Sequence, residues 1–155
     1  MAANLAETPS SPRTAARMTQ RPGHLIRRVH QLHAALWASE VSKEVTPTQF
    51  AVLSAVVENP HGDQAMVSRE ASLDSSTAGS VIYRLVQRGW IQVDRDPADR
   101  RRNLLSLTPE GEAAHAEIAP AAAEMTEHLV GALDLAEQST LVDLLGKIIG
   151  AHPGR

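Results

Sequence analysis

The chain has 155 residues, a formal net charge of −3 at neutral pH and no cysteine. A chain of this length can bury a core of its own, so we expect one domain that needs neither disulfides nor a structural metal. The lack of cysteine excludes zinc ribbons, thiol nucleophiles and cysteine-based peroxide sensors. No apolar run approaches the ~18 residues of a membrane span and the start lacks the apolar segment of a secretory signal, so we expect a soluble, cytoplasmic protein.

Residues 1–20 differ in composition from the rest of the chain. They are rich in alanine, serine, threonine and proline and show no sustained apolar period. A segment that buries so little apolar surface cannot offset the entropy that it loses on ordering. We therefore expect a disordered N-terminal arm, followed by a single domain over residues 21–155.

Charge is distributed unevenly along that domain. Residues 84–102 hold six arginines against three aspartates, whereas residues 103–155 hold two basic and eight acidic side chains. A protein with one basic face and an acidic remainder meets phosphates with that face alone. The distribution therefore argues against indiscriminate coating of nucleic acid and favours a local binding surface.

Helical periodicity dominates the first half of the domain. Four helices are predicted, at about residues 22–43, 47–59, 64–71 and 75–88. Thr46-Pro47 and Asp63 are typical helix starts, because threonine and aspartate cap free N–H groups and proline lacks the N–H that a first turn leaves unpaired. Gly89 is a typical helix end. The third and fourth helices are separated by a tight turn, which predicts a helix-turn-helix.

The second half begins with two short strand-like segments, residues 91–95 and 103–107, which are separated by an arginine-rich turn. Thr108-Pro109 then starts a long alanine-rich helix, which Pro120 should bend or interrupt. A last helix is predicted from about residue 135 to residue 150. The fold class is therefore mainly α with a small two- or three-stranded β wing.

This order of elements is that of a winged helix-turn-helix, whose second helix enters the major groove of DNA while the wing reaches the flanking backbone or minor groove. The candidate DNA-binding residues are Ser75, Ser76, Thr77, Ser80, Arg84, Arg100, Arg101 and Arg102. The residues expected to face the core instead are Leu73, Ala78, Val81 and Leu85. A serine and threonine cluster can also be a plain helix cap, and an arginine run a solvated surface. The direct succession of helix and wing favours DNA contact.

The stretch from Leu73 to Gly111 resembles the signature of MarR-type regulators: a recognition helix, a glycine-hydrophobic step, Asp-x-Arg in the wing and an exit of the form Leu-Thr-x-x-Gly. The resemblance implies a winged-helix lobe at about residues 45–110 and long dimerisation helices over residues 21–44 and 111–150. It also implies a homodimer on a near-palindromic operator. Asp99 and Arg101 match the Asp-x-Arg pair, in which the acid has a structural role and holds the arginine ready for the groove.

The first helix, GHLIRRVHQLHAALW, resembles that of MarR-type regulators of aromatic-acid catabolism, which respond to protocatechuate or related hydroxybenzoates. The candidate ligand-binding residues are Arg27, His30, His33 and Trp37. The resemblance implies that Arg27 pairs with the carboxylate of an aromatic effector and that the protein is a repressor released by it. The alternatives are that Trp37 fills the core, that His33 is an interface histidine and that Arg27 pairs within the dimer.

The sequence is also compatible with other functions. A regulator that responds to a metal could use His24, His30 or His33, another kind of ligand could act as effector, and a winged helix can serve protein contacts alone. An enzyme is not expected, because H-E-x-x-H, G-x-S-x-G and phosphate-binding glycine motifs are all missing from the sequence. We accordingly expect no catalytic residue, no metal site and no cofactor.

Overall fold

The computed structural model describes residues 20–152, so all but the last residue of the expected N-terminal arm lies outside the described range. The described chain divides into two units, residues 20–32 and residues 33–152. The expectation of a single domain over residues 21–155 stays a prediction.

The first unit consists mainly of the beginning of helix α1 (Pro22–Leu36), which has no buried residue. Its apolar side chains are each about half exposed, and they are Leu25, Ile26, Val29 and Leu32. The predicted first helix ends in the second unit, where the last turns widen into a π-helix, η2 (Trp37–Val41). The side chain of Ser42 then accepts the N–H groups of Glu44 and Val45 and turns the chain.

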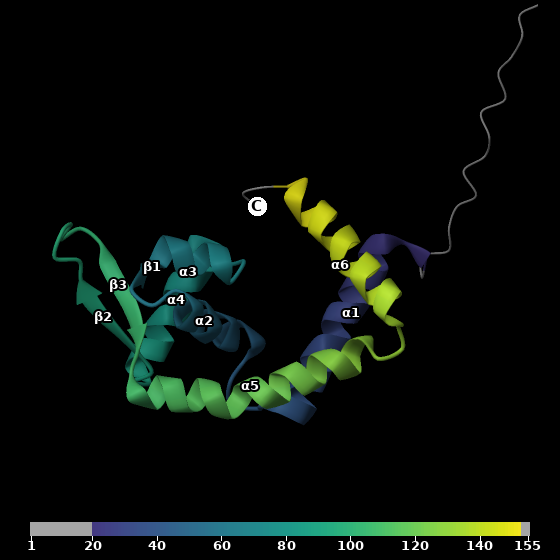
Figure 1. Cartoon of the computed structure of the whole chain (residues 1–155), viewed down its shortest axis with the longest axis horizontal. Coiled ribbons are helices and arrows are strands. Elements are labelled where there is room, and N and C mark those ends of the chain that lie inside the picture. The colour runs from purple at the N-terminus through teal and green to yellow at the C-terminus, as the bar shows by residue number, and fades with distance from the viewer. Residues whose placement is uncertain (1–19, 153–155) are drawn as a thin grey trace, which may run out of the picture. The chain divides into compact units, whose positions relative to one another are not determined.

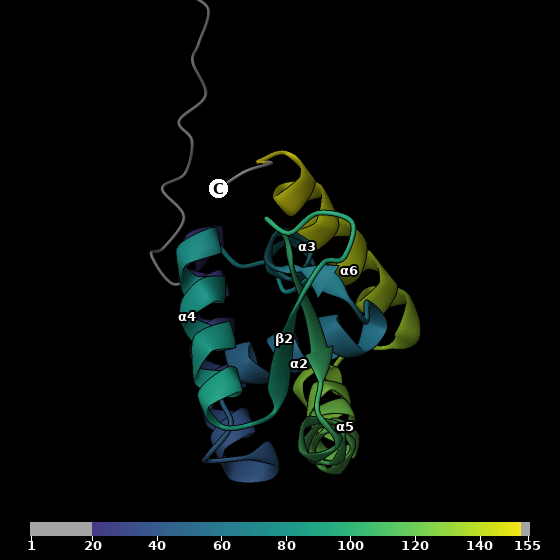
Figure 2. The same cartoon turned by 90° about the vertical axis from the view of Figure 1, so that its left-hand side faces the viewer.

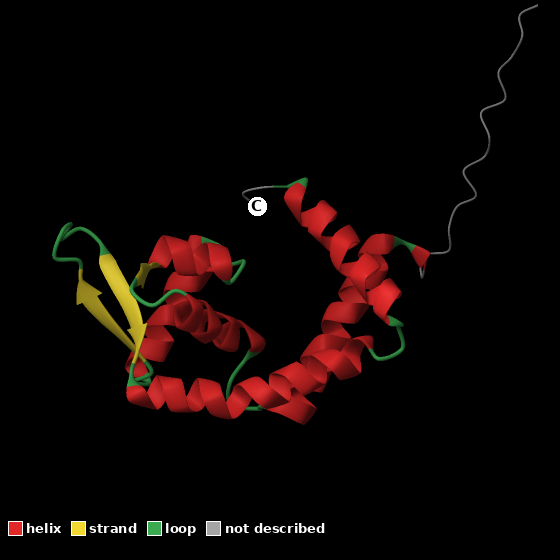
Figure 3. Ribbon diagram, viewed as in Figure 1, coloured by secondary structure: helices red, strands yellow, loops and turns green. Residues whose placement is uncertain are grey.

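The second unit contains the helix-turn-helix and the wing (Figures 1 and 3). Helices α2 (Pro47–Glu58), α3 (Gln64–Glu70) and α4 (Ser75–Gln87) pack together beside a hairpin of β2 (Ile91–Arg95) and β3 (Asn103–Leu107). Helix α5 (Pro109–Val130) begins at the foot of the hairpin, and α6 (Leu135–Gly150) ends the described chain. Side-chain caps start five of these helices, from Thr46, Asp63, Asp74, Thr108 and Asp134.

The sheet has three antiparallel strands in the order β1-β3-β2, with β1 formed by Gly62–Asp63. Strand β1 pairs with Leu104 and Leu105 of β3. The three-stranded alternative of the predicted fold class is therefore the one observed, and the mainly α winged helix-turn-helix fold is confirmed. Figure 2 shows α4 alongside the hairpin, a packing that fixes the recognition helix against the wing.

The core of the lobe lies among α2, α3, α4 and the hairpin. Leu53, Val67 and Leu85 are completely shielded from solvent at its centre. Burying side chains of this size contributes roughly 1.5–3 kcal/mol each. The expected inward direction of Ala78, Val81 and Leu85 is confirmed, and Leu73 is half-buried against the same cluster.

A second cluster joins η2, α2 and α5 through Trp37, Phe50 and Met125. Helix α5 runs unbroken through Pro120, so the interruption that this proline predicted does not occur. Proline removes one helical hydrogen bond, but the exposed Pro120 is followed by the buried Ala122 and Met125, whose packing holds the helix together. Over residues 20–152, none of the helices combines the length and hydropathy that a membrane crossing requires.

Candidate nucleic-acid interface and ligand cleft

Helix α4 has two distinct faces. Ala78, Val81 and Leu85 are buried, whereas Ser76, Ser80 and Arg84 are exposed on the opposite side. The helix starts where it does because the Asp74 carboxylate accepts the Thr77 N–H at 2.9 Å and the Thr77 hydroxyl as well. These bonds, the hydroxyl first, lower the pKa of Asp74. Thr77 is thus engaged in the cap, while the serines and Arg84 present hydrogen-bonding groups to solvent.

Sequence reasoning missed Tyr83 on this face. Its side chain is 65% exposed, and it lines a shallow surface with Ser76, Gly79, Ser80 and Arg84. The signal was present in the sequence, because positions 76, 80 and 83 recur at helical spacing. A large exposed aromatic on a polar helix face fits contact with another molecule, since its phenol can donate a hydrogen bond while its ring packs.

The wing tip is shaped by two aspartates that bond the chain two residues ahead. Asp96 accepts the Ala98 N–H at 2.8 Å and Asp99 accepts the Arg101 N–H at 3.0 Å. Aspartate favours such turns because its short carboxylate reaches the main chain. Arg95 adds a bond from its guanidinium to the Arg100 carbonyl at 2.9 Å. The tip is therefore ordered by its own side chains, with Arg100 and Arg101 exposed.

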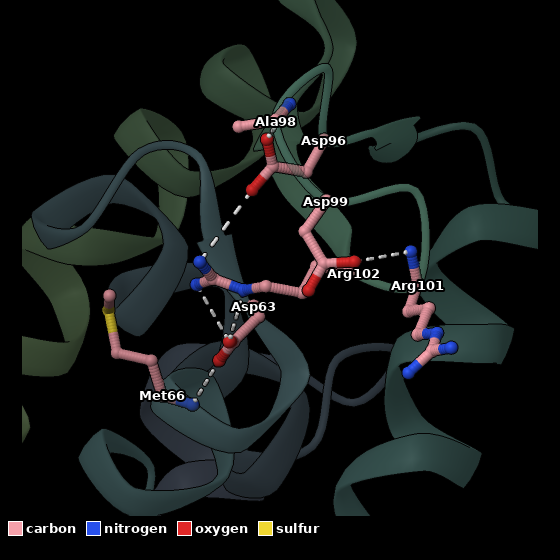
Figure 4. A network of polar contacts seen from close by, with 7 residues as sticks. All are labelled: Asp63, Met66, Asp96, Ala98, Asp99, Arg101 and Arg102. Carbon is pink, nitrogen blue, oxygen red and sulfur yellow. Dashed lines mark hydrogen bonds and ion pairs between the residues drawn. The ribbon is translucent and has the colours of Figure 1, made fainter.

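Asp99 contacts Arg101 through the main chain, a bond that the resemblance did not specify. Its carboxylate bonds the main-chain N–H of Arg101, and Figure 4 shows the Arg101 guanidinium directed away from it. Among residues 20–152 no ion pair joins these two side chains. Asp99 therefore shapes the wing-tip turn through the backbone, and this turn leaves the side chain of Arg101 exposed to solvent.

Arg102 differs from its two neighbours because its guanidinium is paired. Two of its nitrogens bond Asp63, Nη2 at 2.9 Å and Nε at 3.2 Å. Its third nitrogen lies 3.6 Å from the Asp96 carboxylate. The sequence grouped Arg102 with Arg100 and Arg101 as a DNA contact, and nothing in the spacing could show that its partner lies 39 residues earlier.

A cleft of about 620 Å³ opens in the second unit between η2, α2 and α5. Its lining is largely apolar and includes His33, Trp37, Phe50, Ser54, Met125 and Thr126. Most small-molecule sites have this character, an apolar concavity with a few convergent polar groups. The structure thus brings His33 and Trp37 to one cleft, with their rings 6.3 Å apart.

Trp37 also serves the core, as the alternative interpretation held. Its side chain is only 5% exposed and its indole N–H donates to the Val45 carbonyl at 2.6 Å. Its ring lies 5.5 Å from that of Phe50. Because its only polar atom is satisfied, Trp37 offers a ligand an apolar wall and no hydrogen bond.

Sequence reasoning also missed His115 of α5, beside the cleft. Its ring stacks on Phe50 with centroids 5.1 Å apart, and its Nε2 lies 3.1 Å from the hydroxyl of Ser54. Burial lowers the pKa of His115, and the negative charge of Glu58 opposes this only in part. The imidazole is therefore held neutral and joins α2 to α5. Only tertiary packing brings these residues together, since 61 positions separate Ser54 from His115.

Arg27 and His30 belong to the first unit, where both side chains are exposed. A guanidinium nitrogen of Arg27 lies 3.3 Å from Nδ1 of His24. Their part in a ligand site stays a prediction. Within residues 20–152, no group of three or more histidine, aspartate or glutamate side chains is arranged to hold a metal ion.

A helix-turn-helix followed directly by a β-hairpin wing defines a winged-helix DNA-binding protein. A profile of the MarR family matches residues 44–102. The transcriptional repressor NicR of Pseudomonas putida is 31% identical over 133 residues, which cover 85% of this chain and 84% of NicR. The chain belongs to the MarR family, and it is a transcriptional regulator, as its sequence predicted.

Two solved structures support this assignment. The PcaV regulator of Streptomyces coelicolor in complex with its natural ligand matches with a TM-score of 0.83 and 40% identity, covering 86% of this chain and 95% of PcaV. BpsR of Bordetella bronchiseptica, whose DNA binding is regulated by 6-hydroxynicotinic acid, matches with a TM-score of 0.81 and 36% identity, covering 84% of this chain and 94% of BpsR.

Proposed function

We propose that the protein is a homodimeric repressor that binds a near-palindromic operator and is released from it by a small aromatic acid. The observation that carries this proposal is the exposed face of α4, where Ser76, Ser80, Tyr83 and Arg84 stand opposite a fully packed core. Hydroxyl and guanidinium groups at that spacing suit base edges in a major groove. Arg100 and Arg101 at the wing tip suit the adjoining phosphates or minor groove.

The DNA-binding proposal is tested with a duplex enriched from a random library by the wild-type protein. Arg84→Ala and Arg101→Ala should each weaken binding by about 10- to 100-fold, the range of a lost base or groove contact. Lys43→Ala is the matched control, because it also removes one exposed positive charge but lies outside α4 and the wing. Equal affinities of all four proteins would contradict the proposal.

A second copy of the chain supplies the other half of the operator contact. Helix α6 has no buried residue and exposes Val142, Leu144, Ile148 and Ile149 by half or more. Apolar surface of this extent is normally covered by a partner. Ile148→Glu should therefore shift the protein toward monomer in sedimentation analysis and weaken DNA binding, whereas a wild-type protein that sediments as a monomer would refute the dimer.

We propose that the effector binds in the cleft beside His33, Trp37 and Phe50. Arg27, in the first unit, is the residue that the resemblance pairs with the carboxylate of the effector. The apolar lining supports an aromatic ring, and regulation of BpsR by 6-hydroxynicotinic acid shows what a similar protein recognises. Such an acid releases DNA only if it binds more tightly to a dimer whose α4 helices are misplaced for the operator than to the DNA-binding dimer. Equal affinity for the two forms of the dimer would leave the equilibrium between them unchanged.

Protocatechuate, 4-hydroxybenzoate and 6-hydroxynicotinic acid are the probes for this site. At least one should raise the melting temperature of the protein and release the duplex, because it stabilises the folded state that binds it. Arg27→Ala should retain DNA binding and lose this response, while the neighbouring Arg28→Ala, with the same loss of charge, should keep it. A fully responsive Arg27→Ala protein would remove Arg27 from the site.

The remaining parts of the proposal follow from this role. We propose that the protein acts on DNA in the cytoplasm and that it is not an enzyme. The exposed polar groups gathered on α4 and the wing support a binding role. Purified protein should need no added cofactor to bind the duplex.

A further inference from the structure

The three consecutive arginines of the wing have unequal surroundings. Arg100 and Arg101 are exposed to solvent, whereas the side chain of Arg102 extends from the start of β3 to Asp63 at the N-terminus of α3 (Figure 4). The Nε and Nη2 edge of its guanidinium faces one oxygen of Asp63, and Nη1 faces Asp96. Both aspartates are more buried than the arginine: the Asp63 side chain is 29% exposed, that of Asp96 13%, and that of Arg102 49%.

The carboxylate of Asp63 makes two interactions at once, the cap of α3 and the contact with Arg102. One carboxylate oxygen accepts the Met66 N–H at 2.9 Å and caps α3, while the other accepts from Arg102. Both bonds, that of Met66 first, lower the pKa of Asp63, so the carboxylate is charged at neutral pH. The residue that starts the first helix of the helix-turn-helix is therefore also the anchor of the wing.

Asp96 ties the other side of Arg102 into the wing tip. One of its oxygens shapes the turn through the Ala98 N–H, and the other faces the guanidinium. The main chain of Arg102 closes the same loop, since its N–H donates to the Asp99 carbonyl and its carbonyl accepts the Asp96 N–H. The backbone of Arg102 thus closes the loop over residues 96–102, and its side chain joins that loop to the N-terminus of α3.

We propose that Arg102 is a positioning residue, which fixes the wing against the helix-turn-helix so that Arg100 and Arg101 are held at a set place relative to α4. This inference rests on the proposed DNA-binding function. A phosphate would have to compete with two carboxylates for the guanidinium, so Arg102 acts through the wing and not by direct contact with DNA.

The substitution Asp63→Asn distinguishes a positioning role of Arg102 from direct contact with DNA, because the two roles predict opposite changes in DNA affinity. Asparagine is as good an N-cap as aspartate, so α3 keeps its start. An asparagine that caps with its oxygen turns its NH₂ group toward Arg102, which then has no acceptor there. If Arg102 positions the wing, the variant binds DNA more weakly. If Arg102 is a DNA ligand restrained by Asp63, the variant frees it and binds more tightly.

The experiment measures the affinity for the selected duplex over a series of salt concentrations for wild type, Asp63→Asn, Arg102→Ala and the double variant. Each single change should weaken binding by about three- to fivefold, the scale of a partly exposed ion pair, and the double variant should be no weaker than either. The salt dependence should keep its slope, whereas Arg101→Ala, which loses a DNA contact, should lower the slope by about 0.9. Tighter binding by Asp63→Asn, or a lower slope for Arg102→Ala, would overturn the proposal.

Amide hydrogen exchange without DNA supplies the second readout. The N–H groups of Ala98 and Arg101, which the wing-tip aspartates hold, should exchange faster in Asp63→Asn and Arg102→Ala than in wild type. Arg101→Ala is the control, because its side chain is not part of the anchor. Unchanged exchange in both variants would refute the anchoring of the wing by Arg102 and Asp63. A wild-type protein that selects no duplex would refute the proposed DNA-binding function. In that case the exchange rates would still decide whether Arg102 anchors the wing.

Discussion

Gly111, the last residue of the Leu-Thr-x-x-Gly exit, is buried in the first turn of α5, where the main chain of Trp90 comes close. A Cβ at this position would stand 2.0 Å from the Trp90 carbonyl oxygen and 2.9 Å from its carbon. Both neighbours are backbone atoms, so no side-chain rotation can relieve the clash. Replacing Gly111 by alanine must therefore push the start of α5 away from the residue that leads into the hairpin.

The expected loss of stability follows from the contacts that are disrupted when the start of α5 moves away from Trp90. Overpacking in a well-packed region costs roughly 1–3 kcal/mol. The Trp90 carbonyl also accepts the Thr108 N–H at 3.1 Å, and loss of that bond adds about 1 kcal/mol. Alanine recovers up to ~1 kcal/mol as a better helix former than glycine. We expect Gly111→Ala to lower the free energy of unfolding by about 2 kcal/mol, which corresponds to about 4–8 °C in melting temperature.

The assay is thermal and urea unfolding at one fixed protein concentration, because the stability of a dimer depends on concentration. Gly146→Ala is the matched control, since it is also a helical glycine but a Cβ there meets no atom of its own chain within 4 Å. The control should be unchanged or slightly more stable. If Gly111→Ala were as stable as Gly146→Ala, the close approach of α5 to Trp90 would not be what requires glycine.

Two further predictions concern a turn and a titration. Gly89 has a φ of 77°, in the left-handed region, and a Cβ there would meet no atom within 4 Å. Gly89→Ala should therefore lower the free energy of unfolding by about 1–2 kcal/mol through backbone strain alone. An unchanged midpoint of urea unfolding would show that this position does not require glycine. Burial lowers the pKa of His115 in the folded protein, so in the unfolded chain this imidazole becomes protonated at a higher pH, near 6.5. The free energy of unfolding should therefore decline as the pH falls below about 6.5, until the pKa of the folded state is passed. His115→Gln should flatten this decline in unfolding measured between about pH 7 and 5, and an equally steep decline would exclude His115 as its source.

The helices and the hairpin were predictable because their signals are local. The caps at Thr46, Asp63, Asp74 and Thr108 bond N–H groups three residues ahead, and the register of apolar residues on α4 follows from its own period. Such interactions are complete within one turn of chain, so the residue order specifies them. The exposed face of α4 was predictable for the same reason, since it is the complement of the buried one.

Tertiary structure decided the interactions whose partners are distant in sequence. The two-residue strand β1 exists only because β3 supplies its hydrogen bonds, and no period can show in so short a segment. Arg102 was indistinguishable from Arg100 and Arg101 until Asp63 was placed beside it. The stacking of His115 on Phe50 likewise depends on how α5 crosses α2. Each of these contacts joins elements whose separation is set by the packing of the core, which the spacing of residues along the chain does not specify.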